Sequence, residues 1–344
     1  MSALRVSAFT AGAQVPSTRI RVRQYREALA ARGVELSEHP AVPNKFSGEP
    51  FAVPRVAWEA LQLLSRAPGL IAARDADVVW LERELVWRRR TLERFAGRRE
   101  RRVLDVDDAI WLDGDGRFSE AIAGECAGVI AGNAHIAEHY APHTAKTWVV
   151  PTSVDMRRWR RPRPPSRDRW VVGWSGTSGN FRYLMEIEEP LAQLLSEIPE
   201  MELSIVADRP PPWKALPRGR HRYTRWSEAG EVALVHAMHV GLMPLAMEPW
   251  ALGKCAAKML ISMAASQPVV VTPVGVNDEV LKMADVGFGA RTPDEWYRHL
   301  RWLYEHRDEA EAMGARGAAL VEERFSLEVC AARLAEVFHE VAGR

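Results

Sequence analysis

The chain has 344 residues, of which 47% are apolar and 26% are charged, a globular composition that excludes a mainly disordered or collagen-like protein. Its 46 Lys and Arg residues are balanced by 45 Asp and Glu residues, so polymeric nucleic acid is not an expected partner. Only six of the basic residues are lysines, and two of these, Lys254 and Lys258, lie four residues apart.

The three cysteines, Cys126, Cys255 and Cys330, are too few and too far apart for a disulfide scaffold or a zinc-binding pair. We therefore expect a reducing, cytoplasmic environment. The sequence has no run of 18 apolar residues, so no transmembrane helix is expected. The first residues faintly resemble a signal peptide, but the alternation of Leu4, Val6 and Ala8 favours a β-strand.

Short apolar runs alternate with helical stretches in the first half of the chain. The predicted strands are residues 4–9, 78–81, 103–106, 128–131 and 148–150. The predicted helices are residues 18–32, which Gly33 ends, 85–96 and 135–140. This alternation predicts a parallel sheet that is covered by helices on both faces.

An arginine- and proline-rich stretch, residues 157–169, predicts an exposed linker, after which the alternation begins again. The predicted strands are now residues 170–174, 203–206, 240–243 and 268–272, and the predicted helices are residues 183–195, 231–238 and 254–265. From residue 293 to about residue 342 the pattern is helical, with a joint at residues 324–326.

The sequence thus predicts an α/β protein with two doubly wound, Rossmann-like parallel-sheet domains facing a cleft, and a helical C-terminal tail. The expected boundaries are an N-terminal domain at residues 1–156, the linker at 157–169, a C-terminal domain at 170–325 and a final helix at 326–344 that packs back on the N-terminal domain.

Candidate binding residues follow the predicted strands, because open parallel sheets bind ligands at the carboxyl ends of their strands. In the first half they are Gly12, Ser17, Arg19, Asp107, Asp108 and Asn133. In the second half they are Ser175, Gly176, Thr177, Ser178, Lys254, Lys258, Gly275, Asn277 and Glu279.

Two features of the second half suggest that an anion binds there. Residues 175–180 are small and open onto a predicted helix, whose first N–H groups are suited to a phosphate, although an ordinary strand-to-helix turn has the same composition. Lys254 and Lys258 share a face if they lie on one helix, and the scarcity of lysine favours phosphate binding over a solvated helix end.

Other charged groups leave alternatives open. Asp107 and Asp108 are suited to acid–base chemistry, or Asp108 caps the next helix. The histidines at residues 135, 139 and 143 have no Cys or Glu partner in the local pattern, so we expect surface residues and no metal. Residues 83–102 contain nine Arg and three Glu, which form either a solvated face or a patch for anionic lipid headgroups at the inner face of a membrane.

Several segments resemble GT-B glycosyltransferases, specifically the large retaining family 4 that uses nucleotide-sugar donors. The sharpest is Gly253-Lys254-Cys255 with Lys258, followed by Met263-Ala264-Ala265-Ser266-Gln267-Pro268-Val269-Val270, because a subgroup of this family carries Gly-Lys-Cys-x-x-Lys before Met-Ala-x-Gly-x-Pro-Val-Val. Further similar segments are Asp105–Trp111, Pro151–Asp155, Gly173–Gly176, Val240–Leu245, Pro249-Trp250, Pro273–Asn277, Met313-Gly314 and Arg324–Ser326.

The resemblance implies transfer of a sugar from a UDP- or GDP-sugar to a glycan, lipid-linked or small-molecule acceptor, with retention and without metal or another cofactor. It implies that residues 175–178, Lys254 and Lys258 neutralise the leaving diphosphate. It also implies that Gly275 and Asn277 approach the donor. On the acceptor side it implies Asp107 or Asp108 and Arg19, together with Gly12, Ser17 and Asn133.

The sequence departs from the family at its two glutamates, which contact the donor sugar and the ribose. Gly253 and Ile261 stand at the corresponding positions, and Glu248 or Glu279 are candidate replacements. Ser266 also stands where the family has glycine. This departure leaves open a catalytically silent GT-B protein that binds a partner or a glycan, and, with a poorer motif match, a nucleotide-sugar epimerase.

Overall fold

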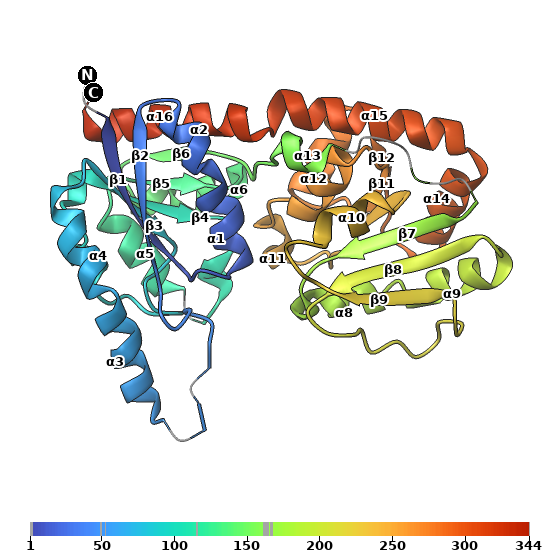
Figure 1. Cartoon of the computed structure of the whole chain (residues 1–344), viewed down its shortest axis with the longest axis horizontal. Coiled ribbons are helices and arrows are strands. Elements are labelled where there is room, and N and C mark those ends of the chain that lie inside the picture. Colours follow the sequence, from blue (N-terminus) through green and yellow to red (C-terminus); the bar gives the residue numbers. More distant parts are fainter. Residues whose placement is uncertain are drawn as a thin grey trace. The chain divides into compact units, whose positions relative to one another are not determined.

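The computed structural model of the protein describes residues 3–48, 50–51, 53–114, 116–160, 165 and 168–343. Most of the predicted linker, residues 161–164, 166 and 167, lies outside the described residues. The chain divides into a first unit, Met1–Ser153 with Gly253–Cys255 and Leu327–Arg344, and a second unit, Val154–Leu252 with Ala256–Ser326. Each unit contains a six-stranded sheet whose strand pairs are all parallel (Figure 1). The predicted pair of doubly wound parallel sheets is confirmed.

The sheet of the first unit has the strand order β2-β1-β3-β4-β5-β6. Its strands are β1 (Leu4–Thr10), β2 (Val34–Pro40), β3 (Val78–Glu82), β4 (Arg102–Val106), β5 (Gly128–Ala131) and β6 (Thr147–Val149). Its α-helices are α1 (Pro16–Arg21), α2 (Arg26–Ala30), α3 (Arg55–Ser65), α4 (Ala67–Ala72), α5 (Arg117–Gly124), α6 (Ala134–Tyr140) and α16 (Leu327–Ala342).

Apolar side chains cover both faces of this sheet, as expected for buried parallel strands. Leu4, Val6 and Trp80 share one core with Leu29 of α2. Residues of α16, among them Leu327, Cys330, Leu334 and Phe338, complete that core. The other core contains residues of β1, β3, α5 and α6, among them Phe9, Leu81, Ile122 and Tyr140. The C-terminal helix is therefore an integral part of the first unit.

The sheet of the second unit has the order β12-β11-β10-β7-β8-β9. Its strands are β7 (Trp170–Ser175), β8 (Met201–Ala207), β9 (His221–Arg225), β10 (Val240–Met243), β11 (Val269–Val271) and β12 (Gly287–Gly289). Its α-helices are α7 (Met156–Trp159), α8 (Phe181–Met185), α9 (Glu188–Glu197), α10 (Glu231–His236), α11 (Pro249–Leu252), α12 (Ala257–Ala264), α13 (Val276–Met283), α14 (Pro293–Glu305) and α15 (Arg307–Arg324).

Each sheet has one topological switch point. The strands that follow β1 lie on both sides of it, since β1 pairs with β2 and with β3. In the second unit β7 likewise pairs with β8 and with β10. Crevices form at such points outside the carboxyl ends of the strands, so the segments after β1, β3, β7 and β10 are the places to look for ligands.

Four predicted helices differ from the structure, and one of them, residues 183–195, is divided into α8 and α9 at residues 186 and 187. Residues 18–32 form α1, a short 3-10 turn (Arg23–Tyr25) and α2, because the backbone leaves the helical region at buried Val22. Residues 85–96 are largely irregular, since Arg88 has a φ of +57° and Val86 forms an isolated bridge with Arg89. The helix predicted from residue 254 begins at Ala257, because Ala256 has a φ of +54°.

The edge strands β2, β9 and β12 were not predicted, because two of them are half-exposed and polar and the third is only three residues long. The tail was predicted well: α14, α15 and α16 follow one another, with the expected joint at residues 325 and 326. None of the helices in the described ranges combines the length and the hydropathy needed to cross a bilayer.

Candidate functional site

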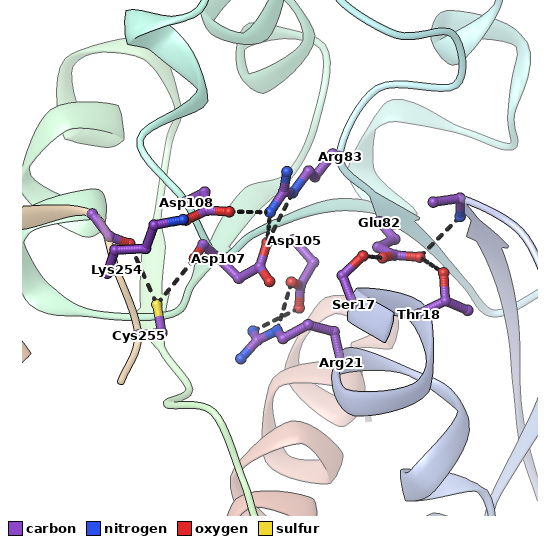
Figure 2. A network of polar contacts seen from close by, with 12 residues as sticks. Ser17, Thr18, Arg21, Glu82, Arg83, Asp105, Asp107, Asp108, Lys254 and Cys255 are labelled. Carbon is purple, nitrogen blue, oxygen red and sulfur yellow. Dashed lines mark hydrogen bonds and ion pairs between the residues drawn. The ribbon is translucent and has the colours of Figure 1, made fainter. Parts of the chain in front are cut away.

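Glu82 organises the switch point of the first unit. Its buried carboxylate ends β3 and accepts hydrogen bonds from the Ala11 backbone N–H at 2.9 Å, the Ser17 hydroxyl at 2.7 Å and the Thr18 hydroxyl at 2.5 Å (Figure 2). Of these residues only Ser17 was predicted to belong to the site. The missed signal is the carboxylate that directly follows the apolar run Val78–Leu81. Glu82 thus fixes the loop after β1 and the first turn of α1.

A buried ion pair lies behind this loop. Arg21 donates to both carboxylate oxygens of Asp105, from Nε at 3.0 Å and from Nη2 at 2.9 Å, and Nη1 donates to the Val150 carbonyl at 2.9 Å. Burial lowers the pKa of Arg21, but the Asp105 carboxylate more than offsets this, so its pKa is raised and the guanidinium stays charged. Both side chains are at most 2% exposed, which makes this pair a structural support for α1.

The two predicted aspartates after β4 are held by cations. Arg83 donates from Nε to Asp107 at 2.8 Å and from Nη2 to Asp108 at 2.8 Å, and the Lys254 ammonium donates to Asp108 at 2.8 Å (Figure 2). Burial raises the pKa of Asp107, but the charges of Arg83, Arg21 and Lys254 outweigh this and lower it. The Asp107 carboxylate is therefore better suited to fixing cations than to accepting a proton at neutral pH.

The expectation that Lys254 and Lys258 share one helix face is wrong. Lys254 precedes α12 and belongs to the first unit, whereas Lys258 lies in the first turn of α12 in the second unit. The left-handed backbone of Ala256 separates them. The acidic partner of Lys254 is Asp108, and neighbouring Cys255 donates its buried thiol to the Asp107 carbonyl at 3.2 Å.

Lys258 lies at the switch point of the second unit. Its ammonium is 5.7 Å from the centre of the Trp174 ring on β7. A Cβ atom on Gly176, in the loop after β7, would lie 2.5 Å from the Lys258 Cε atom. Glycine at position 176 therefore leaves room for a cationic side chain beside this loop.

The loop after β7 uses several of its own donors. The backbone N–H and the hydroxyl of Ser178 donate to the Asp208 carboxylate at 2.6 and 2.7 Å. The Gly176 N–H bonds to the Val206 carbonyl, and the Asn180 amide donates to Thr177 Oγ1 at 3.0 Å. Both Ser178 donors are thus already bound to Asp208, a residue that was not predicted to belong to the site.

The remaining predicted donor-side residues follow β10 and β11. The Glu248 carboxylate accepts from the Tyr183 hydroxyl at 2.5 Å and from Arg182 Nη2 at 3.0 Å. Gly275 has a φ of +54° and a ψ of −132°, a conformation that only glycine adopts readily, at the start of α13. Asn277 is buried and donates to the Thr272 carbonyl, so it supports the loop, whereas Glu279 is exposed.

On the predicted acceptor side, Gly12 and Asn133 have structural roles. A Cβ atom on Gly12, whose φ is +152°, would lie 2.4 Å from Asn44 Cβ. Asn133 caps α6 by accepting from the Ile136 N–H at 2.8 Å and also donates to the Lys254 carbonyl. Arg19 lies half-buried on α1, directly after the Glu82-bound hydroxyls of Ser17 and Thr18.

Three positions depart from the family pattern, and the structure describes the surroundings of each. A Cβ atom on Gly253 would lie 2.5 Å from the Ala109 nitrogen, so a glutamate does not fit this conformation. Ile261 packs against the apolar core of the second unit. Ser266 has a φ of +54°, the left-handed conformation that explains glycine in the family.

The histidine group differs from the expectation that it lacks an acidic partner. Glu120 Oε1 of α5 lies 3.4 Å from His139 Nε2 and 3.8 Å from His143 Nε2. Within the described residues this is one group of three whose ligand atoms lie close enough together to hold a metal ion. His139 also stacks on Trp111, with ring centres 4.0 Å apart, and burial lowers the pKa of its imidazole.

The Arg83–Arg102 run does not form one continuous exposed face. The guanidinium of Arg83 is bound to Asp107 and Asp108, and that of Arg102 is buried and donates to the carbonyl oxygens of Ala96 and Glu125. Residues 87–90 between them are exposed.

The fold closely resembles that of solved glycosyltransferase structures. Sucrose-phosphate synthase from Thermosynechococcus elongatus has a TM-score of 0.68 at 15% identity, with 99% of each chain covered. WaaG, a glycosyltransferase involved in lipopolysaccharide biosynthesis, has 0.68 at 14%, covering 97% of this chain and 99% of its own. Anabaena HepE in complex with UDP-glucose has 0.67 at 13%, covering 98% of this chain and 100% of its own.

Neither a protein-family model nor a curated protein matches the sequence. At such low identities the structural likeness shows the fold, and the chain therefore has the GT-B fold that the motifs predicted.

Proposed function

We propose that the protein is a glycosyltransferase that moves a sugar from a UDP- or GDP-sugar to a glycan, lipid-linked or small-molecule acceptor. The observation that carries the proposal is Lys258, a cation beside the glycine-containing loop at the switch point of the second sheet. Parallel sheets bind nucleotides at such points, and a fixed ammonium stabilises the charge that develops on a departing diphosphate. The UDP and UDP-glucose complexes of HepE, which has the same fold, support this assignment.

In this proposal the second unit binds the donor and the first unit binds the acceptor. Lys258 compensates the charge of the diphosphate, and Gly176 and Gly275 leave room for it. Glu248 replaces one missing family glutamate as an acceptor for donor hydroxyl groups. Asp107 and Asp108 act as positioning residues, because their carboxylates bind Arg83 and Lys254.

We infer retention of the anomeric configuration, since both carboxylates that directly follow β4, those of Asp107 and Asp108, are bound to cations. The leaving phosphate then accepts the proton of the acceptor hydroxyl as the glycosidic bond forms. Lysine supplies the charge compensation, so metal is not required. The three buried, unpaired cysteines are in keeping with a reducing, cytoplasmic location.

The test is slow donor hydrolysis, followed by NMR over a panel of UDP- and GDP-sugars. Lys258→Ala should lower the rate by about 30- to 1,000-fold, because removing one donor to a developing anion costs ~2–4 kcal/mol. Lys282→Ala is the matched control, since Lys282 is an exposed lysine paired with Asp278 on α13. Donor binding without hydrolysis or transfer would instead support a catalytically silent binding protein.

A further inference from the structure

Helices α3 and α4 of the first unit bury a partly polar face and expose an apolar one, the opposite of the usual pattern for a surface helix. They follow one another end to end (Figure 1), and the side of the pair that faces the protein carries Gln62, Arg66, Gly69 and Ala73. These buried positions recur every three or four residues, so they form one helical stripe. The inner stripe is thus partly polar.

The outer stripe is entirely apolar. The exposed residues at its helical spacing are Val56, Ala57, Ala60, Leu61, Leu64, Ala67, Pro68, Ile71 and Ala72. The exposed fractions are 79% for Val56, 70% for Leu64 and 62% for Ile71. A helix that packs on a core normally shows the opposite pattern, with the apolar stripe inward and polar residues outward. A contiguous exposed apolar surface of this kind indicates a binding face.

Polar contacts fix this orientation of the two helices. Arg66 is 1% exposed, and it donates to the carbonyl oxygens of Thr10 and Leu85 at 2.8 and 2.9 Å. Gln62 donates to the Asn44 carbonyl at 3.3 Å. Turning the apolar stripe inward would carry Arg66 to the surface, break these bonds and deprive the buried carbonyl oxygens of Thr10 and Leu85 of these donors. The outward direction of the apolar stripe is therefore built into the first unit.

Arginines border the apolar stripe. Arg55 begins α3 and Arg74 follows α4, and both are exposed. The exposed Arg88-Arg89-Arg90 segment lies beside α3, because Arg89 Nη1 is 3.3 Å from Glu59 Oε2. From residue 55 to residue 100 eight arginines but only two acidic residues, Asp75 and Glu100, are exposed.

Two aromatic side chains complete the border. Trp87 is 46% exposed, lies 6.4 Å from Phe46 between ring centres and packs under the Arg88 guanidinium at 4.5 Å. Phe46 is itself 41% exposed. Tryptophan and arginine side by side are typical of the boundary between headgroups and acyl chains, where an apolar ring and a cation are both accommodated.

We propose that the α3–α4 face docks on an anionic lipid bilayer, with the apolar stripe among the acyl chains and the bordering arginines at the headgroups. The charge decides between occupants. Arg55 and Arg89 share Glu59, Arg88 pairs with Asp113 and Arg90 with Glu125, but the exposed arginines of residues 55–100 still outnumber the exposed acidic residues eight to two. A second copy would bring two such surpluses together, whereas anionic lipids neutralise them. This inference stands on surface chemistry alone and holds whether or not the protein transfers sugar. It moves the membrane contact from the whole Arg83–Arg102 run to α3, α4 and the Trp87–Arg90 segment.

The test is co-sedimentation of the full chain with vesicles of phosphatidylcholine, with and without phosphatidylglycerol. The wild type should bind the anionic vesicles far better, and added salt should weaken the binding, because screening acts on exposed charges. Leu64→Gln with Ile71→Gln should lower the partition coefficient at least about tenfold, since it removes apolar side chains without adding charge. The matched control is Leu252→Gln with Met283→Gln, two exposed apolar residues on helices of the second unit.

A second pair of variants tests the arginines. Arg88→Gln with Arg90→Gln should reduce binding to anionic vesicles about 10- to 30-fold, at roughly fivefold per charge near the surface, and should flatten the salt dependence. Arg298→Gln with Arg301→Gln on α14 is the control and should change it less than twofold. The variants alter exposed positions, so their thermal unfolding should match the wild type.

Three outcomes would overturn the proposal. One is the absence of wild-type binding to phosphatidylglycerol vesicles at low salt. Another is an equal loss of binding in the α3–α4 variants and in their controls. The third is a wild-type dimer in sedimentation equilibrium that the Leu64 and Ile71 substitutions dissociate while vesicle binding is unchanged, because that result would assign the face to a second copy.

Discussion

Replacing Glu82 tests whether its carboxylate holds the loop after β1 in place or is simply buried beside it. Glu82→Ala removes the acceptor of three hydrogen bonds. Ala11 and Thr18 are at most 1% exposed, so their donors cannot turn to water, whereas Ser17 is half-buried and can. Two buried donors left without acceptors, at about 1–3 kcal/mol each, predict a loss of about 2–6 kcal/mol of local stability.

Glu82→Gln provides the matched comparison. The amide oxygen can still accept from Ala11 and Thr18, and its NH2 group can donate to Ser17, whose hydroxyl can turn to accept. The expected loss is only about 1 kcal/mol, which reflects the missing charge. Hydrogen exchange of the peptide spanning residues 4–21, measured by mass spectrometry, reports the opening free energy of this segment directly. Equal exchange in both variants, or exchange unchanged from the wild type, would refute the role assigned to Glu82.

Three further predictions concern positions elsewhere in the chain. Arg21→Met should destabilise the first unit by about 3–5 kcal/mol in urea unfolding, because it leaves Asp105 buried and unpaired, and Arg21→Met with Asp105→Leu should recover most of this loss; no recovery would contradict the ion-pair account. Ser266→Gly should raise the thermal midpoint by relieving a left-handed backbone, to the extent of roughly 0.5–1 kcal/mol, and a lower midpoint would contradict the strain. Gly253→Glu should destabilise the first unit through contact with the Ala109 backbone, which calorimetry would detect as a lower unfolding temperature, whereas an unchanged temperature together with higher activity would show that the family glutamate fits after all.

The interior strands could be predicted from the sequence because buried parallel strands are short, uniformly apolar runs. Residues 128–131 and 240–243 agree with β5 and β10 in both bounds. The polar edge strands β2 and β9 lack this signal, and their stability comes from pairing with a neighbour that the sequence does not identify. Tertiary contacts also determine the backbone conformation of residues 85–96. Arginines and leucines favour a helix there, but the segment is irregular around Arg88.

The residues that the structure brings together at the candidate site were predicted only in part. Lys258 and Gly176 were singled out and lie together, since both follow strands that meet at one switch point. Lys254 was placed on the wrong element because four-residue spacing implies one helix face only if the helix is continuous, and Ala256 breaks it. Glu82 and Asp208 were missed because their partners are distant in the sequence or bound through backbone N–H groups.

The central claim is that the second unit binds a nucleotide diphosphate beside Lys258. Calorimetric titration of the full chain with UDP and with GDP tests this claim most directly, because it needs neither the correct sugar nor the acceptor. We predict saturable binding of one of the two, weakened at least about tenfold in Lys258→Ala and unchanged in Lys282→Ala. The absence of binding for both nucleotides, or equal binding by Lys258→Ala and the wild type, would contradict the account.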